Sequence, residues 1–317
     1  MSFRIIGTGS YVPEKVVTNF DLANVIETSD EWIRQRVGIA ERRISTDKSA
    51  AEMGYNAAVK ALEMSNVSPD ELDLIIVASI SNDTTCPTAA GTIQKMLGAN
   101  CAAFDVNSAC SGFIFALDTA AGFFARGKAK KALIVGCERM SKIIDWHDRG
   151  TCVIFGDGAG AAVLETGNGY LESKISTFGG DNVIKIPSGT ESSPYYTKSA
   201  EPQYVFMDGQ ETFKFAVNTI TSEIQEITEK AGLSVDDIKY VVPHQANIRI
   251  IQYASKRLSL PMDKFFVNIE KYGNTSAASI PMALDELNRS GGLNSDDIIV
   301  MTAFVGGLSS ATCIIKW

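Results

Sequence analysis

Histidine and closely paired cysteine are scarce in this chain of 317 residues. It contains two histidines, His147 and His244, and six cysteines, no two of which are spaced as Cys-x-x-Cys. Structural zinc sites and thioredoxin-type redox centres use such spacings, so neither is favoured here and we expect no metal. A reaction that needs two histidines would have to use both of them.

Long apolar runs and an excess of positive charge are also missing. The longest apolar run, residues 113–125, is interrupted by Asp118 and falls short of the roughly 18 residues that a membrane span needs. The amino-terminal residues lack the pattern of a secretion signal. With 29 basic and 37 acidic residues, the chain does not look like a nucleic-acid binder held by bulk charge. We therefore expect a cytoplasmic protein with reduced thiols that binds neither membrane nor nucleic acid.

Apolar runs that alternate with helical patterns predict a layered α/β fold. Residues 74–79 and 131–136 are near-continuous apolar runs, which is typical of strands covered on both faces. Between them, residues 111–126 have the pattern of a buried helix that ends at Gly127. At about 150 residues per domain, the length is that of two domains.

The second half of the chain repeats the plan of the first. Residues 68–77 (SPDELDLIIV) align with residues 234–243 (SVDDIKYVVP), and a helical pattern precedes each segment. At the same offset Cys110 aligns with Ser276, and each of these sites opens a helix. Both halves then close on a glycine-rich turn that runs into a strand. This order predicts a duplicated fold whose halves are residues 1–167 and 168–317.

A long loop is expected between the repeats. Residues 177–203 are rich in Gly, Ser, Pro and Tyr and show neither a helical nor a strand period. Loops of this length are often functional, so this one is a candidate lining for a substrate tunnel.

Cys110 is the first candidate for chemistry. It stands between a strand-like segment, residues 102–104, and an apolar helix. A cysteine at such a junction lies at the positive end of the helix dipole, which favours the thiolate and lowers the thiol pKa. Its small neighbours Ala109, Ser111 and Gly112 would let a substrate approach. The alternative is a small buried thiol without a chemical role.

His244 and Asn274 are the candidate partners of this cysteine. His244 follows an apolar strand, where ligands gather in α/β sheets, and Asn274 precedes a helix, where it could also be only a cap. Cysteine forms thioesters, while His and Asn can donate hydrogen bonds to an oxygen that gains charge. Gly306 would offer a backbone N–H to an oxyanion, or simply form a turn. His147 has polar neighbours and is expected at the surface.

Basic residues cluster near these candidates despite the acidic total. The alternative to a patch that collects an acidic partner is a set of ordinary solvated helix faces. The residues are Lys214, Arg249, Lys256 and Arg257, with Arg34, Arg36 and Arg149 beside tryptophans.

Several motifs together resemble the β-ketoacyl-acyl carrier protein synthase III family. They are residues 105–113 (DVNSACSGF), 242–247 (VPHQAN), 273–281 (GNTSAASIP) and 155–160 (FGDGAG), with 6–13 (IGTGSYVP) and 28–33 (TSDEWI) near the start. The resemblance covers nearly the whole chain. It implies a thiolase-type fold, a duplicated five-layered αβαβα sandwich, and a homodimer.

The resemblance also implies a reaction that needs no cofactor beyond a coenzyme A thioester as substrate. An acyl group moves from coenzyme A to Cys110, and malonyl-acyl carrier protein then loses carbon dioxide. His244 and Asn274 stabilise the enolate, which attacks the thioester, whose oxyanion lies on the N–H groups of Cys110 and Gly306. Elongating synthases have histidine where Asn274 stands, and thiolases need a second cysteine, for which Cys313 in the terminal strand is a poor match.

The same resemblance assigns ligand contacts. Trp32 and Arg149 would sandwich the adenine of coenzyme A, Arg36 would meet its phosphates, and Asn247 would meet the pantetheine arm. The acyl and pantetheine tunnel would be lined by Phe155, Met207 and Phe304, and the acidic carrier protein would dock on Lys214, Arg249, Lys256 and Arg257.

Cys86 departs from the best-known family pattern. Some members place phenylalanine before the following proline, and that residue reaches across the dimer to floor the partner's acyl pocket. The smaller Cys86 suggests a pocket for primers longer or more branched than acetyl.

Two other functions stay open. One is a specialised priming or head-to-head condensing synthase of secondary metabolism. The other is a silent partner subunit, which the intact Cys110, His244 and Asn274 argue against.

Overall fold

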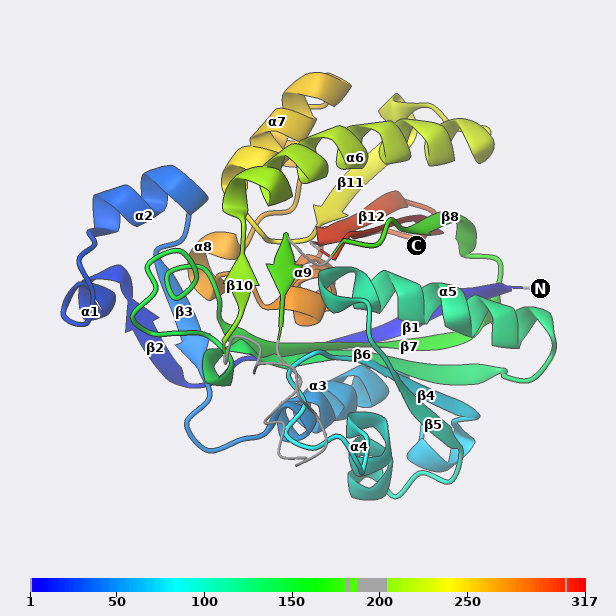
Figure 1. Ribbon diagram of the computed structural model, residues 1–317. Helices are drawn as coiled ribbons and strands as arrows, with labels where there is room; N and C mark the ends of the chain where they lie inside the picture. Colours follow the sequence, from blue (N-terminus) through cyan, green and yellow to red (C-terminus); the bar gives the residue numbers. More distant parts are fainter. Residues whose placement is uncertain (1, 181–182, 187–203, 306) are drawn as a thin grey trace.

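The computed structural model describes residues 2–180, 183–186, 204–305 and 307–317. Its helices and strands stack in five layers, with two sheets separated by helices and covered by further helices on their outer faces (Figure 1). The five-layered αβαβα sandwich expected from the sequence is confirmed. None of the helices in these ranges is long and apolar enough to cross a membrane.

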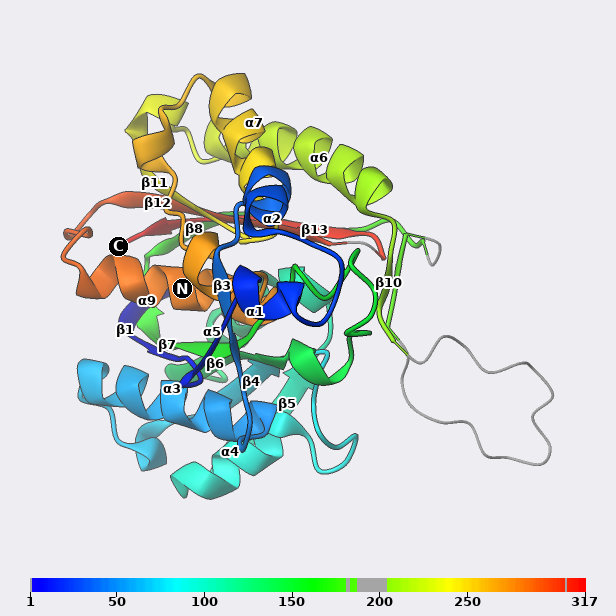
Figure 2. The ribbon, with the colours of Figure 1, turned by 90° about the vertical axis from the view of Figure 1, so that its left-hand side faces the viewer.

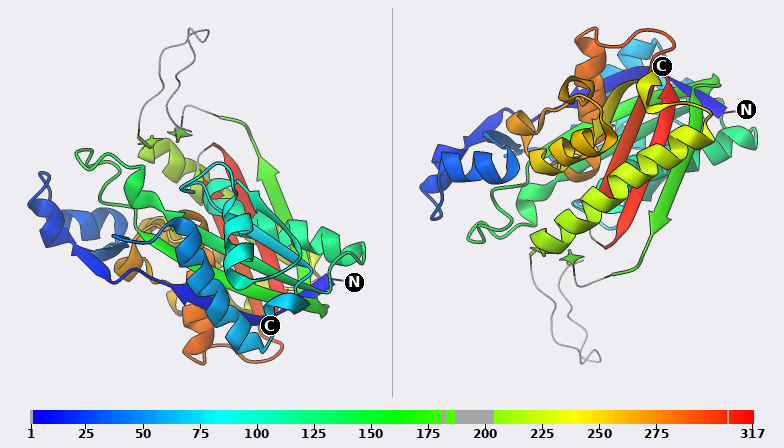
Figure 3. Two further views of the ribbon diagram at one scale, coloured as in Figure 1. Left: turned by 90° about the horizontal axis from the view of Figure 1, so that it is seen from below. Right: turned by 90° about the horizontal axis from the view of Figure 1, so that it is seen from above.

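The first sheet has five strands in the order β1-β7-β6-β4-β5. β4 pairs in parallel with β5 and β6, whereas β7 runs antiparallel to β6 and β1. Two helices cross its outer face (Figure 3). The strands are β1 (Ser2–Tyr11), β4 (Leu74–Ala78), β5 (Ala102–Val106), β6 (Lys131–Arg139) and β7 (Asp157–Gly167), and the helices are α3 (Ala50–Ser65) and α4 (Ala89–Leu97).

The second sheet has four strands in the order β11-β12-β13-β8. Two helices cover its outer face (Figure 3). The strands are β8 (Tyr170–Thr177), β11 (Ile238–Pro243), β12 (Ile298–Val305) and β13 (Ser309–Lys316), and the helices are α6 (Gly209–Lys230) and α7 (Ile248–Leu258). The predicted boundary at residue 167 falls between β7 and β8, and the division into two domains stays a prediction.

The middle layer carries the largest apolar core. It consists of α5 (Gly112–Ala125) and α9 (Ser279–Arg289), which pack side chains such as Phe113 and Leu284 between the two sheets. A single turn of 3₁₀ helix precedes each of them, η2 (Ala109–Ser111) before α5 and η6 (Ser276–Ala278) before α9.

The two 3₁₀ helices correct the sequence alignment of the halves by one residue. Both begin with a positive φ, 43° at Ala109 and 49° at Ser276. The structural counterpart of Ser276 is therefore Ala109, and that of Cys110 is Ala277. The predicted offset does hold earlier in the repeats, at η1 (Pro69–Glu71) and η4 (Val235–Asp237), so one extra residue enters the second half between those turns and η6.

Glycine in the first sheet lets the middle layer lie against it. A Cβ on Gly136 would lie 2.4 Å from the Ala277 carbonyl oxygen, and one on Gly160 would lie 2.5 Å from the Met282 nitrogen. The glycines at 158 and 160 were expected in a turn that leads into a strand, but they lie inside β7. Their role there is close approach rather than chain reversal.

A smaller lobe stands beside the layers in Figure 1 and faces the viewer in Figure 2. Buried Arg42 joins it to the body, because its guanidinium donates to the carbonyls of Val17 and Val153 and to Asn19 Oδ1. The lobe contains β2 (Lys15–Thr18), α1 (Asn19–Ala23), α2 (Asp30–Val37), β3 (Glu41–Ile44) and α8 (Ile269–Tyr272).

The expected loop at residues 177–203 lies largely outside the described residues. What is described is the end of β8 at Thr177 and a short antiparallel pair, β9 (Ile184–Lys185) with β10 (Phe206–Met207). Two further 3₁₀ turns complete the elements, η3 (Met140–Lys142) and η5 (Met262–Lys264).

Candidate active site

Cys110, His244 and Asn274 line one cavity of about 690 Å³. Cys110 comes from η2, His244 from the end of β11, and Asn274 from the segment that leads into η6. The carboxyl ends of strands and the starts of the two central helices therefore converge, as the repeat predicted. The cavity walls come from both halves of the chain.

Cys110 is a buried neutral thiol. Its side chain is 7% exposed, and Sγ donates a hydrogen bond to Ser276 Oγ at 3.6 Å. Burial raises the pKa of the thiol to about 12; the hydrogen bond to Ser276 opposes this shift, and the negative charge of Glu138 adds to it. The sequence predicted a lowered pKa at the helix start. That expectation is wrong, because burial destabilises the thiolate by more free energy than the nearby backbone dipoles and hydrogen bonds stabilise it.

His244 is held in one orientation by two short hydrogen bonds. Its backbone N–H donates to the Thr302 carbonyl at 2.7 Å, and Nδ1 lies 2.7 Å from Ser279 Oγ. Ser279 Oγ also accepts from the Gln245 N–H at 3.5 Å, so its own proton is available for Nδ1. We infer the tautomer with the proton on Nε2, which makes the ring a donor toward a ligand.

Burial lowers the pKa of His244 to about 3. The imidazole is therefore neutral across the physiological range. A neutral ring with a proton on Nε2 can donate a hydrogen bond to an oxygen without forming an ion pair with a cysteine thiolate.

Asn274 is fixed by its backbone on one side and its side chain on the other. Its N–H donates to the Ile154 carbonyl at 2.9 Å, and its carbonyl accepts from the Gly156 N–H at 3.0 Å. Oδ1 accepts from the Ser276 N–H at 2.8 Å at the start of η6, whose N-cap position is Thr275 and not Asn274. The side chain therefore orders the helix start from the residue before the N-cap, and the amide Nδ2 is the donor that remains for the cavity.

The predicted adenine sandwich is not open in this structure. Arg149 stacks directly on Trp32, with its Cζ 4.7 Å from the ring centroid, and donates to the Glu27 carbonyl at 3.2 Å. Arg36 lies against the same ring at 5.8 Å. All three side chains line the cavity, but a base can enter between Trp32 and Arg149 only after the guanidinium moves away.

Asn247 lines the cavity with both ends of its amide already in use. Oδ1 accepts from the Arg249 N–H at 2.9 Å and caps α7, and Nδ2 donates to the Arg36 carbonyl at 3.2 Å. The side chain therefore ties α7 to α2. Its contact with a pantetheine arm stays a prediction.

The other predicted lining residues divide into three groups. Phe155, Met207 and Phe304 all line the cavity, and Phe304 packs edge-on against His244 at 5.6 Å. Cys86 is exposed and takes no part in the lining. Gly306 lies outside the described residues.

The basic residues lie on neighbouring helices. Lys214 on α6 and Arg249 on α7 line the cavity, whereas Lys256 and Arg257 are exposed in the last turn of α7. Lys214 pairs with Glu211 at 2.7 Å, and Arg249 lies over the Phe213 ring at 5.7 Å.

Three site residues were missed in the sequence: Ser276, Ser279 and Glu138. Ser276 and Ser279 belong to the motif at residues 273–281, but only the fold shows that their hydroxyls face Cys110 and His244. Glu138 gave the one signal in the sequence, because it is an acidic residue directly after the apolar run of β6. His147 is exposed as predicted, and Cys313 is buried inside β13. No metal-binding cluster of three or more His, Cys, Asp or Glu side chains occurs in the described part of the chain.

Comparison with known proteins identifies the family of this chain. The model for 3-oxoacyl-[acyl-carrier-protein] synthase III matches residues 104–179, and the model for its C terminal matches residues 228–317. The β-ketoacyl-[acyl-carrier-protein] synthase III of Clostridium acetobutylicum is 49% identical over 321 aligned positions, which cover 100% of this chain and 99% of that one. The chain belongs to the β-ketoacyl-acyl carrier protein synthase III family. It is a condensing acyltransferase of fatty-acid synthesis with the thiolase-like fold.

Solved structures of the family agree with this fold. The Aquifex aeolicus 3-oxoacyl-[acyl-carrier-protein] synthase III superposes with a TM-score of 0.92 at 43% identity, covering 99% of this chain and 100% of that one. The priming β-ketosynthase of the R1128 polyketide pathway has a TM-score of 0.91 at 36% identity, covering 99% and 96%.

The low pKa of His244 predicts an acid-sensitive fold. Between pH 6.5 and about 3 the unfolded chain binds a proton at this residue and the folded chain does not, so stability falls as the pH falls. Replacing His244→Gln should reduce the stability lost between pH 7 and pH 5 by about 2 kcal/mol, measured by denaturant unfolding. His147→Gln replaces the exposed histidine and serves as the matched control. Equal acid sensitivity in wild type and both variants would contradict a buried neutral His244.

Proposed function

We propose that this synthase III takes an acyl group from acyl-coenzyme A onto Cys110 and condenses it with malonyl-acyl carrier protein. The product is a β-ketoacyl-carrier protein, made in the cytoplasm at the start of fatty-acid synthesis. The observation that carries the proposal is the single cavity in which Cys110, His244 and Asn274 meet. A nucleophile and two hydrogen-bond donors in one enclosed space are what a decarboxylative condensation requires.

Acylation uses Cys110 alone among the three. Sγ attacks the thioester carbon, and the tetrahedral oxyanion is held by backbone N–H groups, for which we propose those of Cys110 and Gly306. The coenzyme A thiolate then leaves. Apolar side chains that line the same cavity, including Phe155 and Phe304, exclude water that would hydrolyse the acyl-enzyme.

Decarboxylation uses the other two side chains. The thioester oxygen of the malonyl group accepts from Nε2–H of His244 and from the amide of Asn274, which stabilises the enolate as carbon dioxide leaves. Neutral donors suit this step, because neither has to lose a proton. The enolate carbon then attacks the Cys110 thioester and releases the cysteine as a thiolate.

Substrate access follows from the residues that line the rest of the cavity. We propose that Trp32, Arg36 and Arg149 bind the nucleotide of coenzyme A, with Asn247 beside the pantetheine arm. The exposed side chains of Lys214, Arg249, Lys256 and Arg257 lie on two adjacent helices, and we assign this basic surface to the acidic carrier protein.

We further propose a homodimer in which Cys86 floors the acyl pocket of the partner subunit. Cys86 is exposed in the single chain and lies outside the cavity of its own subunit, which agrees with a role across an interface. A second function is a specialised priming synthase, favoured by the 36% identity to a polyketide priming β-ketosynthase.

The division of labour among the three residues predicts separable defects. Cys110→Ala should abolish the acyl adduct seen by intact mass after incubation with acyl-coenzyme A, and abolish condensation, while some release of carbon dioxide from malonyl-carrier protein persists. His244→Ala and Asn274→Ala should keep the adduct but lower decarboxylation by about 100-fold. Wild-type decarboxylation in His244→Ala would refute the role given to the imidazole.

Reversal of charge at Arg249 should weaken carrier-protein docking. Arg249→Glu should raise KM for malonyl-carrier protein about tenfold and leave acyl transfer from coenzyme A nearly unchanged. The defect should shrink as salt is added, because exposed charges are screened. Lys230→Glu makes the same charge change in the last turn of α6 and should have no such effect. Equal KM values for the two variants would contradict the proposal that the carrier protein docks on α6 and α7.

The size of Cys86 predicts primer choice. With malonyl-carrier protein as extender, kcat/KM should be higher for branched or four- to six-carbon acyl-coenzyme A than for acetyl-coenzyme A. Cys86→Phe should reverse that order by filling the pocket. A strict acetyl preference in the wild type would overturn the assignment, and efficient turnover with a carrier protein of secondary metabolism alone would favour the second function.

A further inference from the structure

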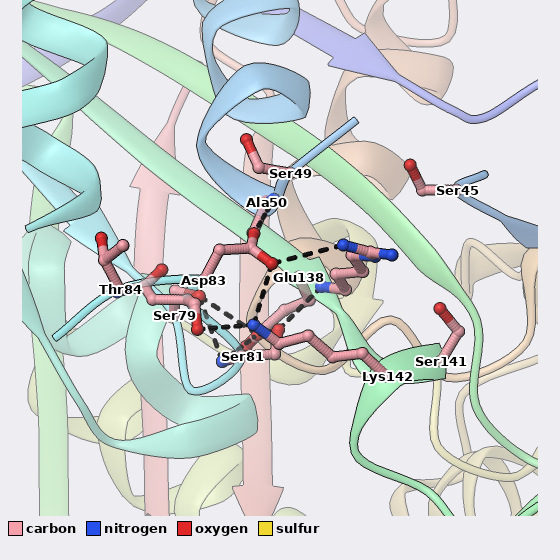
Figure 4. A network of polar contacts seen from close by, with 12 residues as sticks. Ser45, Ser49, Ala50, Ser79, Ser81, Asp83, Thr84, Glu138, Ser141 and Lys142 are labelled. Atoms are coloured by element: carbon pink, nitrogen blue, oxygen red, sulfur yellow. Dashed lines mark hydrogen bonds and ion pairs between the residues drawn. The ribbon is translucent and has the colours of Figure 1, made fainter. Parts of the chain in front are cut away.

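Glu138 is a buried carboxylate that the proposed mechanism does not use. It lies near the end of β6, has no exposed surface, and is surrounded by neutral donors (Figure 4). Ser79 Oγ donates at 3.2 Å, and the backbone N–H groups of Ile80 and Ser81 donate at 3.2 and 3.1 Å. The Ser81 hydroxyl and the Ala277 N–H, at 3.4 Å, complete the set. Such a carboxylate is costly to bury, so its position calls for a reason.

Ser276 connects this carboxylate to the nucleophile. Its hydroxyl accepts the hydrogen bond of the Cys110 thiol at 3.6 Å, and the same side chain lies near enough to Glu138 to lower the pKa of that carboxyl. The next residue, Ala277, donates its N–H to Glu138 Oε1 at 3.4 Å, which places η6 against the carboxylate. Ser276 is fully buried and lines the cavity, whereas Glu138 lies behind it. The order of groups away from the cavity is therefore thiol, hydroxyl, carboxylate. Ala109 occupies the equivalent place in the first half, so at this position of the repeat only the second half has a hydroxyl.

The titratable groups that face Glu138 are two thiols. Cys110 and Cys137 are both buried, and the negative charge of Glu138 raises the pKa of each. Beyond Ser81, Asp83 pairs with two cations, with Lys142 at 3.1 Å (Figure 4) and with Arg139 at 3.3 Å, so this group of three has a net positive charge. Burial raises the pKa of Glu138 to about 7, against the effect of its hydrogen bonds. It can accept and release a proton near neutral pH.

His244 is poorly suited to take the thiol proton. Its Nδ1 is engaged by Ser279, its Nε2 carries the proton needed for the malonyl oxygen, and burial lowers its pKa to about 3. A thiol with a pKa of about 12 still has to lose its proton before or during attack. The site therefore needs another acceptor.

We propose that Ser276 and Glu138 form a proton relay that takes the proton of Cys110 during acylation and returns it after condensation. The proposal rests on the proposed function. As Sγ bonds to the acyl carbon, its proton passes to Ser276 Oγ, and the Ser276 proton passes to the Glu138 carboxylate. The bond between the acyl carbon and the coenzyme A sulfur breaks, and the thiolate takes a proton from solvent.

The second half of the cycle restores every group. The enolate carbon bonds to the acyl carbon, and Cys110 leaves as a thiolate. Protonated Glu138 then gives its proton back through Ser276. One solvent proton is consumed in each turnover, as the overall reaction requires when a carboxylate is lost as carbon dioxide and coenzyme A leaves as a thiol.

The test separates acylation from decarboxylation in the full-length protein. Ser276→Ala and Glu138→Gln should each slow single-turnover acylation by acyl-coenzyme A about 100-fold at pH 7.5, followed by quenched intact mass. Decarboxylation of malonyl-carrier protein should stay within about twofold of wild type, because general acid–base catalysis by the relay serves only the cysteine. Ser111→Ala is the matched control. It removes a buried hydroxyl next to Cys110 that has no hydrogen-bond partner among the residues that the structure describes, and it should acylate normally.

The pH profile supplies a readout that a structural role would not change. Wild-type acylation should rise with pH and level off as Glu138 ionises near pH 7. In Ser276→Ala the rate should instead keep rising with pH, since only the small thiolate fraction reacts. Ser81→Ala removes a donor to the carboxylate and should move the wild-type midpoint upward.

Alkylation of Cys110 by iodoacetamide makes the test independent of the natural substrates. Ser276→Ala should slow it as it slows acylation, even if no acyl-coenzyme A proves to be a substrate and the proposed function fails. The relay is overturned if Ser276→Ala acylates and alkylates at the wild-type rate, or if acylation and decarboxylation fall together. If Glu138→Gln does not fold, the acylation and alkylation rates of Ser276→Ala alone test the relay.

Discussion

The approach of η2 to η6 across the middle layer is the contact on which the site depends. It places Cys110 beside Ser276, and the hydrogen bond from the Ser276 N–H to Oδ1 fixes the amide of Asn274. The approach is possible because β6 has glycine at residue 136, where any side chain would collide with the Ala277 carbonyl. Backbone geometry, more than side-chain identity, thus decides where the reacting groups lie.

Burial sets the protonation of all three titratable groups near this contact. In a poorly solvated environment the charged form is disfavoured, so the thiol stays protonated and the imidazole stays neutral. Glu138 differs because its many donors offset part of that cost. The result is a resting site with little free charge, which suits a reaction in which the only new negative charges are brief and are met by fixed donors.

Sequence reasoning reached the fold and the three central residues because their signals are local. Apolar runs and helix starts are readable in the chain, and the motifs around Cys110, His244 and Asn274 are distinctive. What it missed depends on distances between segments. An insertion of one residue shifted the partner of Cys110, and glycines read as a turn belong to β7. The sign of the Cys110 pKa shift was also wrong, since the extent of burial cannot be read from neighbours in sequence.

The stacking of Arg149 on Trp32 has a consequence for the ligands that can enter the cavity at this end. An exposed cation–π pair is worth about 1 kcal/mol, so a nucleotide that takes the place of the guanidinium must offset that loss. Any planar ligand that enters between Trp32 and Arg149 therefore competes with a contact already made within the chain, whereas a ligand that passes beside the stack does not.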